Sequence, residues 1–275
     1  MDISKKTITG DLSINKPETN SPYLWKYLDL HRFIYLLTEQ KLFFTRLDKL
    51  EDPFEGVAIK ILRDDAKYSK FFSTPDYFPK SFSPEEKIQL ENERKSHQKI
   101  REKEIAKYQT QQYVNCWFAC DRESMAMWNL YSNRDSVAIR IEFEKSKDLL
   151  EESFKKVISE NDKKMSILGQ EIKYLRLNPF DENLPKQNFR FSGLKKDVSF
   201  EYEKEYRFLI ATTPLKTQPP FFAVPIEIKK LEMSIIAHPN MESWKLNNLR
   251  KLLNMTNLKI DIEKSSTLLR SMNFS

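Results

Sequence analysis

Residues 200–208 read FEYEKEYRF and run directly into the apolar residues LIA at 209–211. Side chains of a β-strand alternate between its two faces, so an extended chain here places Glu201, Glu203, Glu205 and Arg207 on one face. Three carboxylates in a row repel one another. This face is therefore either solvated, with Arg207 neutralising Glu205, or it lines a polar site. We expect Glu203 and Glu205 in such a site and Glu201 at the surface.

Composition argues against the common nucleotide-binding loops. The chain of 275 residues has only four glycines, and neither GxGxxG nor GxxxxGK[ST] occurs. Loops that cradle phosphates need closely spaced glycines, so a Rossmann dinucleotide site and a P-loop NTPase are not expected. The net charge of +6, from 46 basic and 40 acidic residues, is a mild excess that suits any anionic ligand.

The cysteines and histidines predict neither a disulfide nor a metal site. Cys116 and Cys120 on one strand would lie ~13 Å apart, too far to bridge. They are typical of reduced thiols in a cytoplasmic protein. The three histidines are scattered and no metal-ligand spacing occurs, so we expect no bound metal. No apolar run is long enough for a membrane span, and residues 1–10 do not resemble a signal peptide.

Around the central stretch, strands and helices follow one another without a regular βαβ rhythm. We therefore expect an α+β fold: a single domain over residues 21–275 with a mixed, mainly antiparallel sheet. A charged helical insertion is expected at about 60–112, and residues 1–20 are predicted to be a flexible arm. Strands are predicted at 23–28, 42–47, 113–120, 136–143, 169–175, 202–212, 222–228, 233–238 and 258–263. Helices are predicted at 30–40, from 84 towards 112, and at 125–131, 147–164 and 242–253.

Five blocks of the chain resemble the bacterial domain-of-unknown-function 2971 family and occur in that family's order. The resemblance is taken to extend over residues 23 to 270, nearly the whole chain. Where family members usually carry a second polar residue after the first cysteine, this chain has Trp117-Phe118-Ala119. The blocks are residues 25–27 with 42–45, residues 52–56, residues 116–118 with 124–131, residues 137–143 and residues 202–207.

More distantly, the layout is similar to the ADP-ribosyltransferase fold, which has a strand, helix and strand early in the chain and a Glu-x-Glu strand late. That superfamily places an Arg or His on its first strand, a Ser, Thr or Tyr on its second and a catalytic Glu on the late one. The resemblance assigns Lys26 or Tyr27 to the first position, Thr45 to the second and Glu205 to the third. This chain departs from the pattern because residues 25–27 contain neither Arg nor His.

A turn at residues 52–56, DPFEG, offers two further acidic side chains. Asp52 and Glu55 could line a substrate cleft, with Pro53 and Gly56 shaping the turn. The alternative is a structural turn in which Phe54 fills the core and Asp52 bonds nearby amides.

Aromatic and basic residues are further candidates for substrate binding. Ser124, Trp128 and Tyr131 fall at i, i+4 and i+7 and share one helical face, on which the rings could stack on a nicotinamide or a base. The alternative is that Trp128 is ordinary core. The side chains of Arg46, Lys195 and Lys196 are candidates for phosphate contacts, or else are solvated.

Two function hypotheses follow. In the first, the chain is an NAD-dependent ADP-ribosyl transferase, with Glu205 as the catalytic carboxylate, Glu203 as its helper and Arg207 or Arg46 as the orienting cation. A carboxylate pair suits the oxocarbenium-like cation formed when nicotinamide leaves NAD. The resemblance implies a toxin or phage-defence setting and a protein or nucleic-acid acceptor. In the second, the chain is a non-catalytic module that binds nucleic acid or a partner protein through residues 84–112 and its basic C-terminal half.

Overall fold

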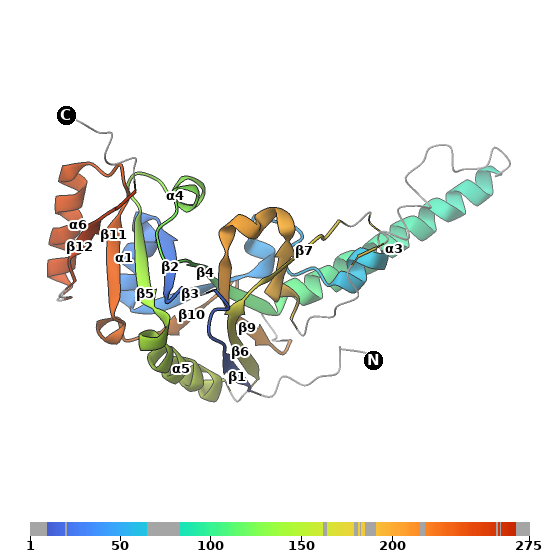
Figure 1. Ribbon diagram of the computed structural model, residues 1–275. Coiled ribbons are helices and arrows are strands. Elements are labelled where there is room, and N and C mark those ends of the chain that lie inside the picture. Colours follow the sequence, from blue (N-terminus) through green and yellow to red (C-terminus); the bar gives the residue numbers. More distant parts are fainter. Residues whose placement is uncertain are drawn as a thin grey trace.

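The computed structural model describes residues 10–19, 21–64, 83–161, 164–178, 181, 183–184, 191–214, 218–256, 258 and 260–267. Residues 65–82 of the expected insertion lie outside these ranges. A ten-stranded sheet forms the centre of the body, with helices on both of its faces (Figure 1). Its strands are β1 (Leu12–Ile14), β2 (Tyr23–Leu28), β3 (Lys41–Arg46), β4 (Gln112–Ala119), β5 (Val137–Glu142), β6 (Met165–Glu171), β9 (Glu205–Thr212), β10 (Phe221–Pro225), β11 (Met233–Ala237) and β12 (Ile262–Lys264).

The strand order is β1-β6-β9-β4-β2-β5-β11-β12, and β3 and β10 continue from one end of β4. Only β1–β6 and β11–β12 are parallel pairs in this sheet, and the other pairs among the described strands are antiparallel. A separate parallel pair is formed by β7 (Lys173–Leu175) and β8 (Lys195–Asp197). The α+β fold with a mixed, mainly antiparallel sheet is therefore confirmed.

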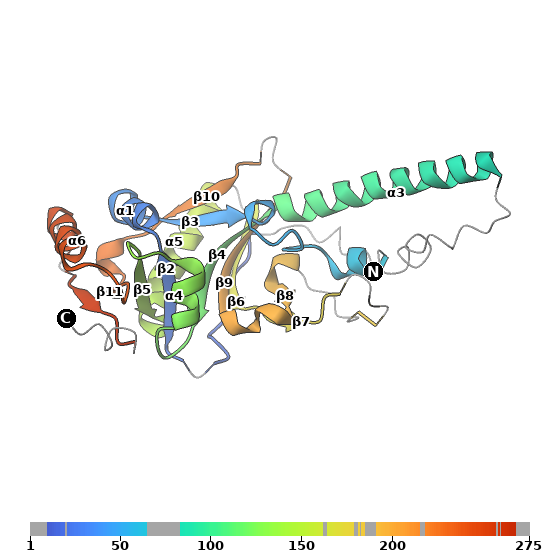
Figure 2. The same cartoon turned by 90° about the horizontal axis from the view of Figure 1, so that it is seen from above.

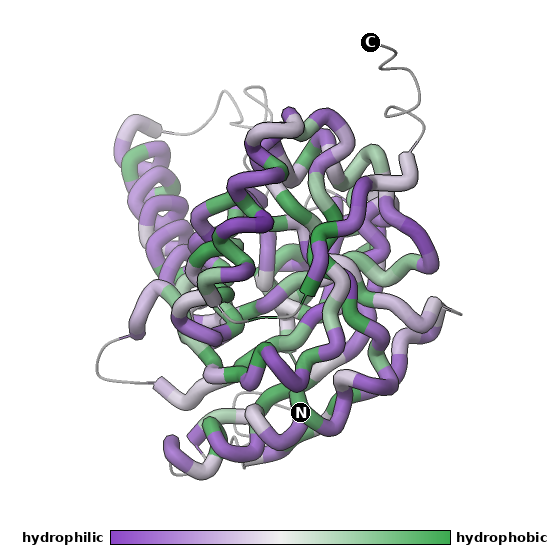
Figure 3. Tube along the Cα trace, turned by 90° about the vertical axis from the view of Figure 1, so that its left-hand side faces the viewer, coloured by the Kyte–Doolittle hydropathy of each residue, from purple (hydrophilic) through white to green (hydrophobic). Residues whose placement is uncertain are grey.

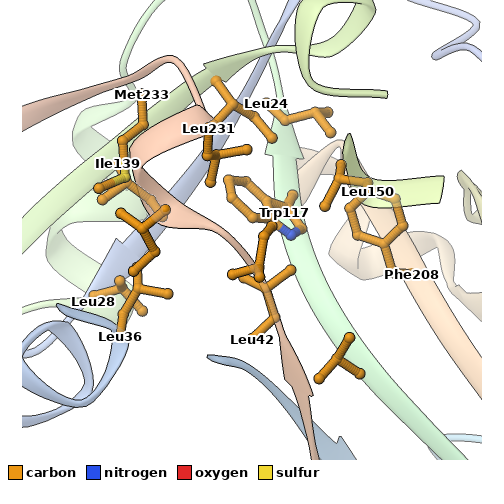
Figure 4. Close-up of a cluster of buried hydrophobic side chains, with 14 of the residues drawn as sticks. Leu24, Leu28, Leu36, Leu42, Trp117, Ile139, Leu150, Phe208, Leu231 and Met233 are labelled. Atoms are coloured by element: carbon orange, nitrogen blue, oxygen red, sulfur yellow. The ribbon is translucent and has the colours of Figure 1, made fainter. Parts of the chain in front are cut away.

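One face of the sheet carries the main apolar core. Tyr206, Phe208 and Ile210 of β9 point to this face, where Phe208 packs near Trp117 and Leu150 (Figure 4). Helices α1 (Leu30–Glu39), α5 (Phe143–Glu160) and α6 (Ser243–Met255) bury their apolar sides against it. Hydrophobic residues accordingly gather in the interior, whereas the outer turns of the helices are hydrophilic (Figure 3).

The opposite face is covered by helix α4 (Met125–Tyr131), the β7–β8 pair and the short 3₁₀ helices beside them (Figure 2). Two small apolar clusters lie there. The first includes Trp25, Tyr27 and Trp128, and the second includes Leu47 and Leu209. Residues Glu205 and Arg207 of β9 face this side because side chains alternate along the strand. We call this side of the sheet the second face.

A split beside β4 interrupts the strand pairing. Strand β2 pairs with β4 at Trp25↔Phe118, and β3 pairs with it at Thr45↔Val114. Residues 115–117 of β4 have no strand partner on this side. Side chains bond backbone groups there instead: Lys26 Nζ donates to Cys116 O at 2.8 Å, and Asn115 Nδ2 donates to Phe43 O at 2.7 Å. Buried carbonyl groups require such partners when no strand supplies them.

The local stretch 200–208 is not one strand, contrary to the prediction. Residues Val198–Glu203 form a 3₁₀ helix, and β9 begins only at Glu205. Asp197 caps the helix by accepting from Ser199 N, and Lys204 has φ 40°, a left-handed conformation that separates the helix from the strand. Turn-forming bonds thus override strand alternation, although Glu205 and Arg207 keep the predicted common face.

The predicted flexible arm also contains order. Residues Leu12–Ile14 form β1, which pairs in parallel with β6. Its backbone groups satisfy the free edge of β6, a long-range pairing that the polar composition of residues 1–20 does not reveal.

Helix α3 (Pro84–Thr110) projects away from the body (Figures 1 and 2). Its start is as predicted: Ser83 accepts from Glu86 N while the Glu86 carboxylate accepts from Ser83 N, and Pro84 opens the first turn. Gln109 near its C-terminal end is the buried residue that joins it to the body. Among the described residues, no helix is both long enough and apolar enough to cross a membrane.

Candidate functional site

The centre of the candidate site is the guanidinium of Arg207, which is fully buried on the second face. Its Nε and Nη2 donate to the two oxygens of Glu205 at 2.6 and 2.8 Å, a bidentate pair. Nη2 also donates to Glu55 Oε1 at 2.9 Å, and Nη1 donates to Gly193 O at 2.7 Å. One cation therefore joins β9, the 52–56 turn and the segment before β8.

Glu205 is held ionised by this arrangement. Burial would raise the pKa of its carboxyl group, but the charge of Arg207 and its hydrogen bonds outweigh burial and hold the pKa below its ordinary value. The backbone N–H of Glu205 donates to Tyr174 Oη at 2.8 Å. This bond joins strand β7 to Glu205, the first residue of strand β9.

Glu203 has a different environment although it lies only two residues away. Its carboxylate accepts from Lys196 Nζ at 2.7 Å and, through a short hydrogen bond, from Tyr131 Oη. Burial raises the pKa of Glu203 above its ordinary value, against the effect of these two donors. The hydroxyl of Tyr131 reaches this carboxylate from a ring that is 45% exposed. Both carboxylates are buried, and their two pKa values are shifted in opposite directions.

The turn at residues 52–56 places the carboxylate of Glu55 beside the guanidinium of Arg207. Gly56 has φ 72°, and a Cβ there would lie 2.3 Å from Leu47 Cδ1, so the turn needs glycine at this position. Asp52 caps the turn by accepting from Phe54 N, and the carboxylate of Glu55 is buried against Arg207. Phe54 is exposed, so the expectation that it fills the core is wrong.

Lys195 and Lys196 are neighbours on β8 with different partners. Lys196 pairs with Glu203, and its ammonium lies 4.3 Å from the centre of the Phe200 ring. Lys195 is more deeply buried, and burial lowers its pKa to about 8, although Glu55 acts in the opposite direction. Neither side chain is solvated, which the sequence left open.

Of the three positions implied by the ADP-ribosyltransferase resemblance, the structure brings two to the face of Glu205. Tyr27 lies on the second face with Trp128, and Thr45 lies beside Val114, which belongs to that face as well. Lys26 points the other way, over the Trp117 ring in the main core, where burial lowers its pKa to about 8. The alternation of strand β2 therefore favours Tyr27 over Lys26 for the first position.

Helix α4 uses its predicted residues in three ways. Ser124 caps the helix, accepting from Met127 N, and its own N–H donates to Tyr27 Oη. The Trp128 ring is fully buried and packs edge-on against Tyr27, so it belongs to the core. Of these three residues, only Tyr131 bonds Glu203.

Arg46 is remote from this network. Its guanidinium pairs with Asp48 and donates to the carbonyl groups of Gln218 and Pro219, which ties β3 to the loop before β10. This is a structural role, since none of these partners belongs to the cluster of Glu55, Glu203 and Glu205.

Sequence reasoning missed four participants. Tyr174, Gly193 and Cys116 contact or surround Glu205 and Arg207 from other strands or turns. Glu123 accepts from Trp128 Nε1 and from Ser265 and Ser266, joining α4 to the C-terminal segment. Apart from the bond between Glu123 and Trp128, no local spacing signals these contacts, because they join residues 14 or more positions apart.

The described residues contain no group of three or more histidine, cysteine or acidic side chains placed to hold a metal ion. Cys116 and Cys120 are both free thiols. The ionisable side chains that the structure brings together here are the carboxylates of Glu55, Glu203 and Glu205, the amine of Lys196 and the phenol of Tyr131.

Comparison with known proteins gives one match. None of the curated proteins and none of the solved structures matches this chain. The family model described as Protein of unknown function (DUF2971) matches residues 127–208, which include Trp128, Tyr131, Glu203, Glu205 and Arg207. The resemblance to the domain-of-unknown-function 2971 family is thus shown over the segment that supplies most of the candidate site.

Proposed function

We propose that the protein is an ADP-ribosyltransferase-like enzyme that takes NAD as its substrate. The observation that carries the proposal is the pair Glu203 and Glu205, two buried carboxylates whose surroundings push their pKa values apart. Such pairs are typical of sites that divide electrostatic and proton-transfer roles between two acids. The proposed setting, bacterial conflict in the cytoplasm as a toxin or phage-defence effector, follows from the fold resemblance alone.

The ionised carboxylate of Glu205 would stabilise positive charge on the ribose. When the bond between C1′ and the nicotinamide nitrogen breaks, the bonding pair leaves with nicotinamide and the sugar becomes an oxocarbenium-like cation. Arg207 keeps Glu205 ionised and fixed in direction. Glu205 therefore acts as a preorganised charge that needs no rearrangement during the reaction.

Glu203 would accept the proton of the acceptor. A hydroxyl or amine of a protein or nucleic acid forms the new bond to C1′, and its proton passes to the Glu203 carboxylate. A raised pKa suits a general base, and the half-exposed Tyr131 marks the side from which an acceptor would approach. Thr45 and Tyr27, on the same face, are the proposed substrate-binding residues.

The test is release of nicotinamide from NAD, with thermal stabilisation by NAD as the binding readout. We expect millimolar NAD to raise Tm, since a ligand of the native state stabilises it. Glu203→Gln should lower turnover by roughly 10²-fold or more. The matched control is Glu201→Gln. Glu201 lies on the same 3₁₀ helix and its side chain is exposed, so the activity of this variant should equal that of wild type.

Two results would contradict the proposal. One is wild-type protein that neither shifts its Tm nor releases nicotinamide at millimolar NAD. The other is a Glu205→Gln variant that stays folded by circular dichroism and keeps full turnover, which would remove Glu205 from the mechanism.

A second candidate function is a partner-binding module built on α3. The observation that favours it is a 27-residue helix with an almost fully exposed surface, including Ile88 and Ile100. Its charges alternate in sign, which suits a protein partner better than a nucleic acid. Exchanging Ile88 and Ile100 for Lys should abolish partner capture and leave nicotinamide release unchanged. Unchanged capture would contradict this candidate.

A further inference from the structure

The hydroxyl of Tyr131 occupies the position beside Glu203 that an acceptor would take in the proposed reaction. It donates a short hydrogen bond to Glu203 Oε1. The other oxygen of this carboxylate, Oε2, accepts from Lys196 Nζ at 2.7 Å. A group whose proton passes to Glu203 must first be hydrogen-bonded to that carboxylate. The phenol of Tyr131 already makes this hydrogen bond.

The ring of Tyr131 is open to solvent, although its hydroxyl meets a buried group. The ring is 45% exposed, whereas the carboxylate of Glu203 is buried. Its support is well packed: Trp128, three residues earlier on α4, is fully buried, and Ser132 Oγ donates to Trp128 O. A reactant that enters from solvent can therefore meet the hydroxyl at the surface while the base lies beneath it.

Two other tyrosines near the site bond backbone groups instead. Tyr27 Oη accepts from Ser124 N at 2.9 Å, and Tyr174 Oη accepts from Glu205 N at 2.8 Å. Neither of these two hydrogen bonds draws a proton from the phenol. Tyr131 donates to a carboxylate, which is the arrangement of an oxygen nucleophile with its general base.

The phenol of Tyr131 needs such a base. Burial, and then the hydrogen bond to Glu203, raise the pKa of Tyr131 above its ordinary value, so the hydroxyl keeps its proton. A neutral phenol is a weak nucleophile until a base takes the proton as the new bond forms. Any reaction of Tyr131 with an electrophile should therefore depend on Glu203.

We propose that Tyr131 is an ADP-ribose acceptor, so that the protein modifies its own chain at this phenol. The inference rests on the proposed function and names an acceptor for the same site. The bond between C1′ and the nicotinamide nitrogen of NAD breaks, and its electron pair leaves with nicotinamide. Tyr131 Oη forms the new bond to C1′, and its proton passes to Glu203 Oε1 and then to solvent. The products are nicotinamide and an O-linked ADP-ribosyl tyrosine.

The test is mass spectrometry of the purified full-length protein after incubation with NAD. We expect a gain in mass of one ADP-ribose group, and peptide fragmentation should place this group on Tyr131. Glu203→Gln should slow the labelling by roughly 10²-fold or more, because the phenol loses its base. Since Tyr131 and Glu203 belong to one chain, the labelled fraction at a given time should not depend on protein concentration.

Tyr131→Phe and Tyr202→Phe form a matched pair of variants. The two rings are equally exposed, at 45% and 46%, and Tyr202 lies in the same 3₁₀ helix as Glu203. The hydroxyl of Tyr131 bonds Glu203, whereas no carboxylate of the described residues accepts from Tyr202. Labelling should be lost in Tyr131→Phe and should keep the wild-type rate in Tyr202→Phe. Circular dichroism confirms that both variants are folded.

Failure of this inference and failure of the proposed function give different results. Nicotinamide release without a label on Tyr131 would overturn the inference and leave the proposed function standing. Neither release nor label would overturn both. A label that persists in Tyr131→Phe would place the acceptor elsewhere. Labelling that speeds up with protein concentration would mean that one chain modifies another, which also contradicts the inference.

Discussion

The two faces of β9 contrast sharply. Tyr206, Phe208 and Ile210 point into a continuous apolar core beneath α1, α5 and α6. Glu205 and Arg207, on the alternate positions of the same strand, are just as buried, yet they carry charge. Packing explains the first face completely. The second face contains ionised groups, whose burial costs free energy that tight pairing only partly offsets.

The difference supports the placement of the proposed site on the second face. A strand that could be apolar on both sides instead keeps a buried guanidinium that two carboxylates share. Deviations from ordinary packing cluster at functional sites, where stability is given up for chemistry. The predictions below test this contrast by changing one face at a time.

The largest effect is expected for Arg207→Met. Two buried carboxylates, Glu55 and Glu205, lose their partner, so the free energy of unfolding should fall by about 3–5 kcal/mol. Urea denaturation measures it. On the apolar face, Phe208→Leu keeps most of the buried area and should cost about 1 kcal/mol. If Arg207→Met loses less free energy of unfolding than Phe208→Leu, the contrast between the charged and the apolar face of β9 is contradicted.

Replacing the whole charged group should reverse this loss. When Arg207, Glu55 and Glu205 are all changed to Met, no charge is left unpaired, and stability should return to within about 2 kcal/mol of wild type. The triple variant should release no nicotinamide, because it lacks the carboxylate of Glu205. A triple variant as unstable as Arg207→Met would mean that the charges serve the fold.

The second effect is a gain of stability in Lys195→Met that depends on pH. Burial lowers the pKa of Lys195 to about 8, below the 10.5 of the unfolded chain. The native state therefore holds fewer protons between these values, and wild-type stability rises with pH across that window. The variant should exceed wild type by about 1–3 kcal/mol at pH 7 and by less at pH 10. A constant difference across this range would contradict the assigned pKa.

A third, smaller effect is expected where Glu123 joins α4 to the C-terminal segment. Its carboxylate accepts from Trp128 and from Ser265 and Ser266. Glu123→Ala should lower the free energy of unfolding by about 1–2 kcal/mol. Hydrogen exchange should show faster opening at residues 265–267 first. Unchanged protection there would show that the bonds contribute nothing.

The smallest stability effect is expected for Tyr131→Phe. The ring is half-exposed, so removing its hydroxyl should change stability by about 0.5–1 kcal/mol. The hydrogen bond to Glu203 lowers the pKa of that carboxyl group, so its loss should raise the pKa further. The rate of nicotinamide release rises with pH as Glu203 loses its proton, so this rise should move to higher pH in the variant. If the pH profile does not move, the hydroxyl of Tyr131 does not influence the pKa of Glu203.

Much of the fold followed from local patterns. The strand Tyr23–Leu28, the helix Met125–Tyr131 and the start of a helix at Pro84 are as predicted, because alternation and helix-start signals act over a few residues. Strand β1 and the 3₁₀ helix before β9 were missed. Both depend on a distant edge or on turn bonds that outweigh side-chain alternation.

The site was predictable in part. Glu203, Glu205 and Glu55 were singled out by charge and turn chemistry, and all three are buried. The pairing of Arg207 with Glu205 followed from their i, i+2 spacing. The other partners could not be inferred, since Arg207 meets Glu55 across 152 positions and Tyr131 meets Glu203 across 72. The direction of Lys26, away from Glu205, depends on the register of β2 against β4.

The central claim is that Glu203 and Glu205 lie in environments that separate their pKa values. A titration of ¹³C-labelled glutamate carboxyl carbons by NMR, assigned with Glu203→Gln and Glu205→Gln, measures both directly. We expect Glu203 to titrate above and Glu205 below the ordinary value of glutamate. Two ordinary values, or the reverse order, would contradict the division of roles and with it the proposed chemistry.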